Sequence, residues 1–260
     1  MASASHRFRE FVASYPAAEP TMPVMHTCIG RRFLGILDTG EIQVGDFDDN
    51  IKASASFHFY GKPSYRPSGV QGYSGAIRSA LFCFVLDYKR LPPPCFAFPF
   101  DSGGYEKIYG EAVGAFPLED FAFKSMHRVP GQLVSAFFGS NKAYYSMKLR
   151  DNVENEIATL DFHSQGFVDI CKTQISVNYD QRSATIELCY QYPIKIDSDN
   201  LLALVAPDTA CQDGEVKSFA KKHNAELIPY ELDLDSIDAR QRQIRDAVHI
   251  WMESKMLFVP

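Results

Sequence analysis

A glutamate inside an apolar, β-forming run is the residue of this chain best suited to chemistry. In residues 182–190 (RSATIELCY) apolar and polar residues alternate, which predicts a strand. Alternation places Glu187 on the face opposite Ile186 and Leu188. Burying an unpaired carboxylate costs several kcal/mol in rough terms, so Glu187 is expected to face solvent, to be paired or to line a polar cleft. A rigid strand also holds a catalytic carboxylate accurately.

A histidine and a threonine form the second group that could do chemistry. His26 and Thr27 lie in a short strand expected over residues 24–28. An imidazole there can donate to a ribose hydroxyl, with the threonine hydroxyl as a second polar contact. The alternative is a partly buried histidine whose ring nitrogen is satisfied by the backbone.

Two loops complete the set of candidates. Residues 57–66 (FHFYGKPSYR) place aromatic rings beside Lys62 and Arg66, which can stack a planar ring and pair with a pyrophosphate. The alternative is a hairpin exit with a solvated basic tip. Residues 99–105 (PFDSGGY) contain paired glycines, which allow close backbone approach to a ligand or simply form a turn. No Gly-Lys-Ser/Thr follows them, so this is not a P-loop.

Bulk properties fit an ordinary globular protein. The chain has 260 residues, 46% hydrophobic content and a net charge of −6, which argues against binding nucleic acid mainly through a basic face. The six cysteines are scattered without a CxxC pair, so no metal is expected. The N-terminal residues lack the apolar stretch of a signal peptide, and no run reaches about 18 apolar residues. A cytoplasmic location with no membrane partner is therefore expected.

Periodicity predicts an α+β fold in one domain, residues 1–260. Residues 199–260 are expected to form a β-α-β-α flank that closes the same sheet system. Helices are expected at 5–14, 31–38 with a stop at Gly40, 118–124, 131–138, 150–163, 213–223 and 238–256. Strands are expected at 24–28, 41–44, 56–61, 81–87, 175–190, 201–206 and 225–230.

The order of these groups resembles the ADP-ribosyltransferase superfamily, in particular its DarT-like branch of DNA-targeting toxins. The matching pieces are Met25-His26-Thr27, the aromatic basic segment 57–66 and the late strand 182–188 followed by Pro193-Ile194. The resemblance implies split mixed β-sheets with flanking helices. It also implies that NAD is the substrate and that ADP-ribose is transferred to nucleic acid or protein, by a toxin or a phage-defence effector that an antitoxin or other neutralising partner could control.

The resemblance also implies a role for each candidate residue. Glu187 would hold the nicotinamide-ribose hydroxyl as the catalytic carboxylate. His26, with Thr27 beside it, would bind the adenosine-side ribose. Two roles have alternatives: Tyr60 or Tyr65 would stack on the nicotinamide, and Lys62 or Arg66 would neutralise the diphosphate.

Two other classes of function stay open at this point. The first is a nucleotide- or nucleic-acid-binding module on the same scaffold that has lost transfer activity. The second is an interaction protein whose partner face is the C-terminal helix, residues 238–256. Within the enzyme class, a variant that moves a phosphate from RNA onto NAD would depend on Arg31, Arg32 and Arg66 more than on Glu187.

Overall fold

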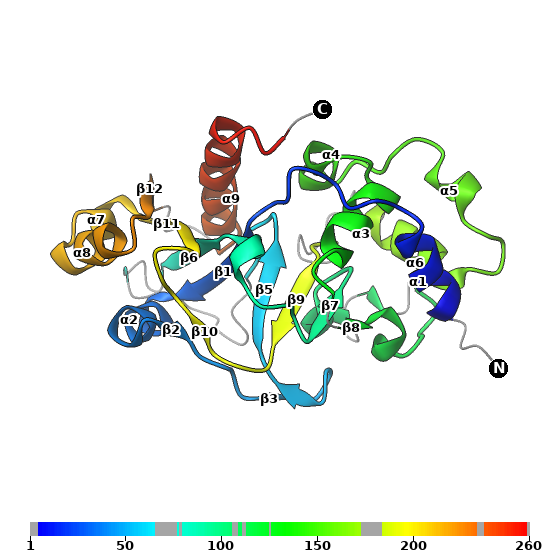
Figure 1. The fold of residues 1–260 in the computed structure, drawn as a ribbon, viewed down its shortest axis with the longest axis horizontal. Coiled ribbons are helices and arrows are strands. Elements are labelled where there is room, and N and C mark those ends of the chain that lie inside the picture. The colour runs from blue at the N-terminus through cyan, green and yellow to red at the C-terminus, as the bar shows by residue number, and fades with distance from the viewer. Residues whose placement is uncertain are drawn as a thin grey trace.

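An eight-stranded mixed sheet forms the centre of the fold, in the order β12-β11-β6-β1-β5-β9-β7-β8 (Figure 1). The computed structural model describes residues 5–65, 77, 80–105, 109–110, 113–124, 126–172, 184–232 and 237–258. All neighbouring strands in the sheet are antiparallel except β11 and β12, which are parallel. The strands are β1 (Val24–Ile29), β5 (Ser56–Tyr60), β6 (Leu81–Leu86), β7 (Phe96–Phe98), β8 (Phe123–Lys124), β9 (Glu187–Tyr190), β11 (Leu201–Pro207) and β12 (Glu226–Tyr230).

The sheet consists of two halves joined at a short seam. β1 pairs with β6 through six residue pairs but with β5 through only two, Val24 opposite Tyr60 and Met25 opposite Phe59. Beyond Met25 the strands β1 and β5 are no longer paired. The half made of β12, β11, β6 and β1 therefore parts from the half made of β5, β9, β7 and β8 at the position of His26.

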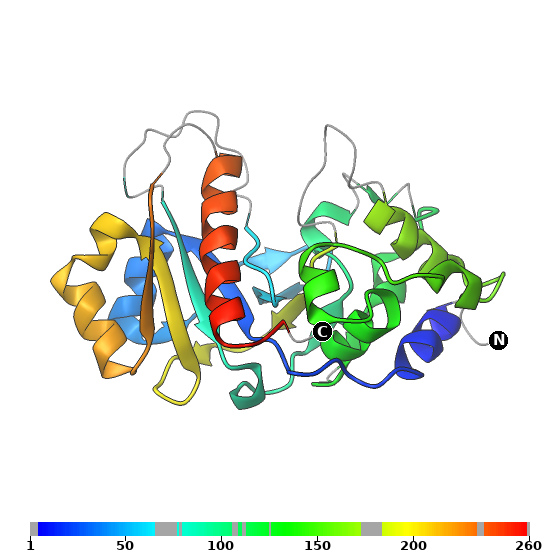
Figure 2. The same ribbon diagram turned by 90° about the horizontal axis from the view of Figure 1, so that it is seen from above.

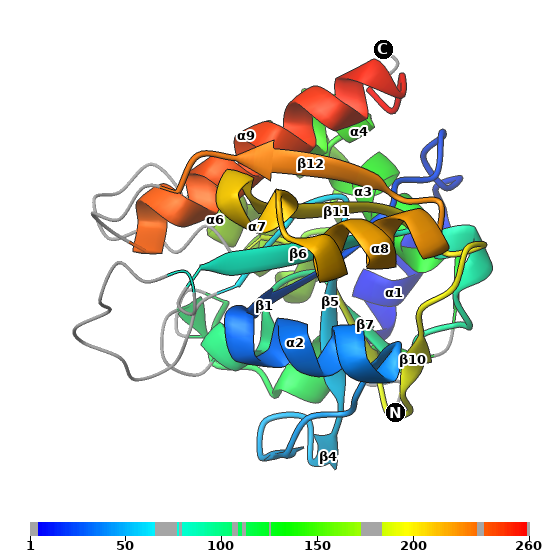
Figure 3. The same cartoon turned by 90° about the vertical axis from the view of Figure 1, so that its left-hand side faces the viewer.

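Helices cover both faces of the first half. Phe33 of α2 (Gly30–Thr39) stacks on Phe82 of β6 with ring centroids 3.9 Å apart, and α2 ends as expected at Gly40, whose φ is +68°. The long helix α9 (Ile237–Ser254) packs against β6, β11 and β12 on the other side from α2 (Figure 1). Helices α7 (Asp208–Cys211) and α8 (Gly214–Lys222) lie beyond α2 at the β12 end (Figure 3).

The remaining helices gather at the β8 end of the sheet (Figure 2). Phe8 of α1 is fully buried there, with its ring 5.6 Å from Phe121 and 5.3 Å from Phe123 between centroids. This aromatic packing fixes the N-terminal helix against the edge strand. The helices are α1 (Ser5–Ala13), α3 (Val129–Phe137), α4 (Asn141–Tyr145), α5 (Val153–Glu156) and α6 (Phe162–Lys172), with 3-10 turns η2 (Tyr88–Arg90), η3 (Ser102–Gly104) and η5 (Leu118–Phe121).

Two short ladders lie outside the main sheet. β2 (Glu41–Ile42) pairs with β10 (Ile194–Lys195), and β3 (Phe47–Asp48) pairs with β4 (Ala53–Ser54) in a small hairpin. The sequence predicted loop with one strand over 41–54 and missed this hairpin. Its strands are two residues long and Phe47 is 63% exposed, so no burial pattern marks them.

The periodic segments were predicted correctly as an α+β fold, and the irregular middle was not. Each of the helices expected at 5–14, 31–38, 131–138, 213–223 and 238–256 is present, and β11 and β12 join the main sheet as expected. The helix expected over 150–163 is wrong. Asn152, with a left-handed φ of +62°, precedes the short helix α5, and the chain leaves the helix at Ile157. α6 begins at Phe162, after Asp161, whose carboxylate accepts the Ser164 N–H at 3.1 Å.

Three further findings concern the described residues. The expected helix over 118–124 is the turn η5 followed by β8, and β7 was not expected at all. Residues 173–183, including the first part of the strand expected before Glu187, lie outside the described residues. The six cysteines form no disulfide, and none of the helices described has the length and apolar content needed to cross a bilayer.

Candidate functional site

Glu187 opens β9, between β5 and β7, in the centre of the second half-sheet. Its side chain is 2% exposed, so the carboxyl lies inside the protein. The Ser102 hydroxyl donates to Glu187 Oε1 at 2.6 Å, and the Cys189 thiol lies 3.5 Å from the same oxygen. Of the alternatives that the sequence left open, the structure therefore selects a buried and hydrogen-bonded carboxyl.

A tight turn positions Ser102, and the Phe100 ring before the turn packs on the Tyr105 and Tyr109 rings after it. Asp101 Oδ1 accepts the Gly104 N–H at 3.1 Å, and the Tyr109 hydroxyl donates to the Asp101 carbonyl. A Cβ at Gly104 would lie 2.9 Å from the Tyr109 ring, so that glycine is required by packing. The paired glycines thus form a turn, and the turn holds Ser102 and Asp101 beside β9.

Two buried carboxyl groups lie close enough to influence one another. Burial raises the pKa of Glu187 well above its usual range, and the nearby Asp101 charge raises that pKa further. The Ser102 hydrogen bond acts in the opposite direction. Glu187 therefore keeps its proton to a higher pH than an exposed glutamate. A carboxyl perturbed by burial and by a like charge is a common mark of a functional site.

Lys62 is buried without a carboxylate partner among the described residues. Its ammonium lies 4.1 Å from the centroid of the Tyr144 ring and contacts the Met147 sulfur. Burial lowers the pKa of Lys62 well below its usual range, and the Arg245 charge lowers it further. The alternative of a solvated basic tip is therefore wrong for Lys62, because this residue is only 2% exposed.

A small cavity rich in hydrogen-bond donors surrounds Lys62. It is also lined by Thr185 and by Arg245 of α9, and the Gln241 side-chain nitrogen in it has no hydrogen-bond partner among the described residues. Thr185 lies in a turn just before β9, so the strand expected to include it begins only at Glu187. The structure thus brings Lys62 and Arg245 close to the part of the chain that carries Glu187.

His26 does not join this group. Met25 lies opposite Phe59, and Phe59 lies opposite Glu187, so these three side chains share one face of the sheet. His26 follows Met25 and points to the other face, where its ring lies 4.8 Å from that of His58. His26 and Glu187 therefore project from opposite faces, and the pocket expected to contain both is absent from this structure.

The histidines form a separate buried cluster. His26 Nδ1 lies 3.1 Å from the Phe57 carbonyl, at the point where β1 and β5 part. His58 Nε2 lies 3.1 Å from the Ser56 hydroxyl. Burial lowers the pKa of His26 to about 4 and that of His58 well below its usual range. The backbone-satisfied alternative for His26 is the one that the structure favours.

The other predicted site residues lie in different surroundings. Tyr60 is 1% exposed and its hydroxyl accepts the Met22 N–H at 3.0 Å, so its ring is part of the core and cannot stack on a ligand. Tyr65 is half-buried. Thr27 is 6% exposed in the ladder between β1 and β6. Arg66 lies outside the described residues.

Sequence reasoning missed three residues of this site. Asp101 and Ser102 were singled out only for the glycines that follow them, although a polar pair inside an aromatic run was a usable signal. Arg245 was assigned to a partner face of the C-terminal helix, and nothing in the sequence relates it to Lys62. Among the described residues no group of three or more metal-ligating side chains is present. Searches against family models, curated proteins and solved structures found no match to this chain.

Proposed function

We propose that this protein is an NAD-dependent ADP-ribosyltransferase in which Glu187 is the catalytic carboxylate. The observation that carries the proposal is a carboxyl held on a central strand by the Ser102 hydroxyl. Arg245 supplies a cationic group near the segment that leads into this strand, and Lys62 would become a second one when an anion binds. This combination suits a substrate that carries a ribose beside a diphosphate, in line with the family that the sequence resembles.

The reaction breaks the bond between nicotinamide and C1′ of the ribose. The bonding electrons leave with nicotinamide, which departs neutral, and positive charge develops on the ribose ring. A fixed carboxylate stabilises this charge, as preorganised groups do for other charged transition states. An acceptor nucleophile then forms the new bond to C1′, and its proton passes to Glu187. A ribose hydroxyl would take the place of the Ser102 hydroxyl on Oε1.

The raised pKa of Glu187 matters for this mechanism. Stabilising positive charge requires the ionised form, whereas burial and Asp101 favour the protonated form. The nicotinamide ring of NAD is itself positively charged, and an adjacent cation lowers the pKa of a carboxyl. Substrate binding would therefore ionise Glu187 at the place where the carboxylate is needed. The reaction rate should accordingly rise with pH as the carboxyl loses its proton.

We assign the diphosphate to Lys62 and Arg245. The cavity beside them has a volume of about 10 Å³, room for about one water molecule, so the surrounding side chains must move before a diphosphate can reach them. Arg245 and the Thr185 hydroxyl face the same cavity and can donate to phosphate oxygens. Lys62 favours its neutral form because it is buried, and an anion at this position would restore its proton. Binding of ADP-ribose, which lacks the nicotinamide cation, is therefore expected to take up a proton, whereas with NAD the proton released by Glu187 offsets this uptake. Tyr65 is the remaining candidate for stacking on the nicotinamide, since Tyr60 is part of the core.

Other features implied by the resemblance stay predictions. The parting of β1 from β5 after Met25 supports the expected split of the sheet into two parts. The acceptor, whether nucleic acid or protein, and a role as a toxin or defence effector controlled by an antitoxin are parts of the same proposal. So is a cytoplasmic location.

Nicotinamide release tests the proposed function. The protein is incubated with labelled NAD and with candidate nucleic-acid and protein acceptors, beside Glu187→Gln and the exposed control Glu215→Gln. We expect Glu187→Gln to lower the rate on the order of 10²–10³ while Glu215→Gln leaves it unchanged. Equal rates for wild type and Glu187→Gln, or no release with any acceptor, would contradict the proposal.

One observation favours a second function, a nucleotide-binding module without transfer activity. His26 lies on the face opposite Glu187, so the two expected contacts to one dinucleotide are not made together. Calorimetry with NAD and with ADP-ribose separates the two functions. A pure binder holds both ligands without releasing nicotinamide, whereas the transferase consumes NAD.

A further inference from the structure

A second and much larger cavity lies at the β8 end of the sheet, apart from the Lys62 cavity. Its volume is about 700 Å³, within the range of pockets that hold small organic ligands. Phe96 and Phe98 of β7 contribute rings to its floor. Other apolar residues complete the lining, among them Val12, Ile51, Leu118, Phe123 and Val129.

The charged residues of this cavity are mostly cationic and lie at its rim. Lys52, Lys124 and Arg128 are exposed and line the cavity, and Glu119 is the one acidic residue in the described lining. None of these three cations makes an ion pair or a side-chain hydrogen bond within the part of the chain that the structure describes. They are therefore available to an anion from outside the protein.

Aromatic and cationic groups are paired directly in the sheet. Lys124 of β8 lies opposite Phe96 of β7, so their side chains stand side by side on one face. An ammonium group next to an exposed ring edge can hold an anion whose flat body covers the ring. An apolar floor with a cationic rim thus selects a ligand that is apolar and planar at one end and negatively charged at the other.

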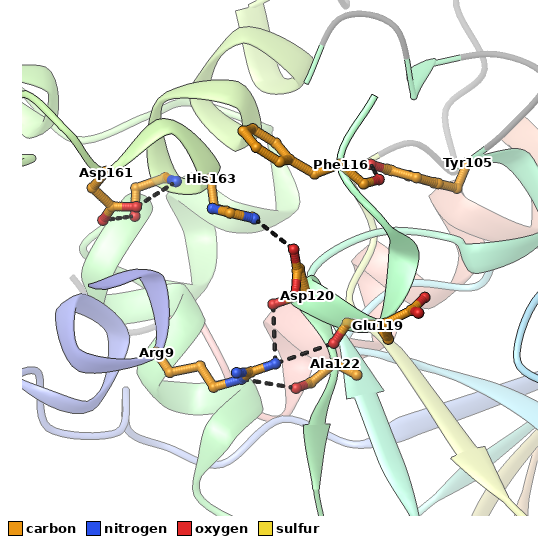
Figure 4. Close-up of polar contacts among 9 residues, drawn as sticks. Arg9, Tyr105, Phe116, Glu119, Asp120, Ala122, Asp161 and His163 are labelled. Carbon is orange, nitrogen blue, oxygen red and sulfur yellow. Dashed lines mark hydrogen bonds and ion pairs between the residues drawn. The ribbon is translucent and has the colours of Figure 1, made fainter. Parts of the chain in front are cut away.

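The wall of the cavity is fixed before any ligand arrives. The Arg9 guanidinium donates to the carbonyls of Glu119, Asp120 and Ala122, each at 3.1 Å (Figure 4). From the other side, His163 Nε2 lies 3.3 Å from Asp120 Oδ2. Arg9 lines the cavity, but its guanidinium donates to these carbonyls, so its role is to hold the wall of the cavity in place. A prebuilt wall lowers the entropy cost of binding.

We propose that this cavity binds a planar aromatic anion of small-molecule size, with its ring against Phe96 and Phe98 and its charge near Lys124 and Arg128. Phe98 lies opposite Glu187 in the β7–β9 ladder, so the ligand would sit on the same face as the catalytic carboxyl. Glu187 does not line the cavity, so this ligand is distinct from the acceptor of ADP-ribose in the proposed function. The binding site itself does not depend on that activity.

Calorimetry with 1-naphthyl phosphate tests the site. Matched arms use 1-naphthol, which lacks the charge, and decanoate, which lacks the ring. We expect 1-naphthyl phosphate to bind at least about tenfold more tightly than either of the other two compounds. A tenfold change in affinity corresponds to about 1.4 kcal/mol. If decanoate binds more tightly than 1-naphthyl phosphate, the ligand is an aliphatic anion and the proposal is wrong. The proposal is also wrong if 1-naphthol binds as tightly as 1-naphthyl phosphate.

Three variants locate the binding in this cavity. The double variant Lys124→Glu/Arg128→Glu should weaken naphthyl phosphate about tenfold or more, whereas Lys142→Glu, an exposed lysine outside the cavity, should not. Binding unaffected by the double variant would overturn the proposal. Glu187→Gln should bind the probe like wild type, because Glu187 does not line the cavity. Loss of transfer activity and loss of this site are thereby distinguished.

Discussion

The two faces of the sheet carry buried titratable pairs that differ in what surrounds them. On one face, His26 and His58 lie ring against ring, and a backbone carbonyl and the Ser56 hydroxyl satisfy one nitrogen of each. On the other, Glu187 lies near a second carboxyl, Asp101, and its hydrogen bond comes from a side chain on a loop.

This difference separates a structural cluster from a candidate site. The histidines are neutral mainly because burial lowers their pKa values, with the Arg32 charge adding to this at His26 and the His26 charge at His58. Neutral imidazoles can stay in the core. Burial and the like charge of Asp101 both raise the pKa of Glu187, so its ionised form is unfavourable in the folded protein. Such a perturbed carboxyl is a mark of a functional site. A cationic substrate would relieve that cost, whereas nothing comparable is gained at the histidine pair.

The largest expected effect concerns the histidine pair and acid. Because the pKa of His26 is lowered from 6.5 to about 4, the unfolded state binds more protons between these values. The free energy of unfolding should therefore fall as pH drops from 6.5 towards 4, by about 3 kcal/mol for this one group. Chemical denaturation across this range measures it.

His26→Asn should flatten that pH dependence, and the exposed control His6→Gln should leave it as in wild type. Glu187, whose pKa is raised, stabilises the folded state as pH falls over the same range and does so in both proteins. Equal pH dependence in wild type and His26→Asn would therefore show that His26 is not held neutral by burial. The histidine pair could then no longer be described as a purely structural cluster that contrasts with Glu187 on the other face.

A smaller effect is expected from Lys62→Met, a change that removes the amine and leaves an unbranched side chain one atom shorter. Burial depresses the pKa of Lys62 below 10.5, so the folded state of wild type is disfavoured at pH 7. The free energy of unfolding of the variant at pH 7 should be about 1–3 kcal/mol higher than that of wild type. That gain should shrink as pH rises towards 10.5, because the unfolded wild type then also loses its proton.

The exposed variant Lys142→Met should show no such gain. If Lys62→Met binds ADP-ribose as tightly as wild type does, the diphosphate assignment of this cavity is wrong. Calorimetry in two buffers of different ionisation enthalpy gives the proton uptake expected for wild type.

The smallest effect is expected from Ser102→Ala. Losing one hydrogen bond to a buried carboxyl costs about 1 kcal/mol of stability. The same bond lowers the pKa of Glu187, so the variant should shift the rise of activity with pH towards higher pH. Ser218→Ala, on the exposed side of α8, is the control. An unchanged pH profile would mean that Ser102 does not act on Glu187.

Periodicity predicted the regular parts of the fold because their burial patterns are local. The alternation around Glu187 and the apolar runs of β6 and β11 appear in the strands themselves. The arrangement of the candidate site could not be predicted from such local patterns. Pairing of Met25 with Phe59 decides the face of His26, and the contact of Arg245 with the Lys62 cavity depends on how α9 packs. Both are long-range properties that no local spacing encodes.

The most direct test compares the two faces in a single assay. Nicotinamide release from NAD is measured against pH for wild type, Glu187→Gln and His26→Asn, with folding of each checked by circular dichroism. We expect a wild-type rate that rises as Glu187 ionises, a loss on the order of 10² or more in Glu187→Gln, and a rate in His26→Asn close to that of wild type. A folded Glu187→Gln as active as wild type would contradict this expectation.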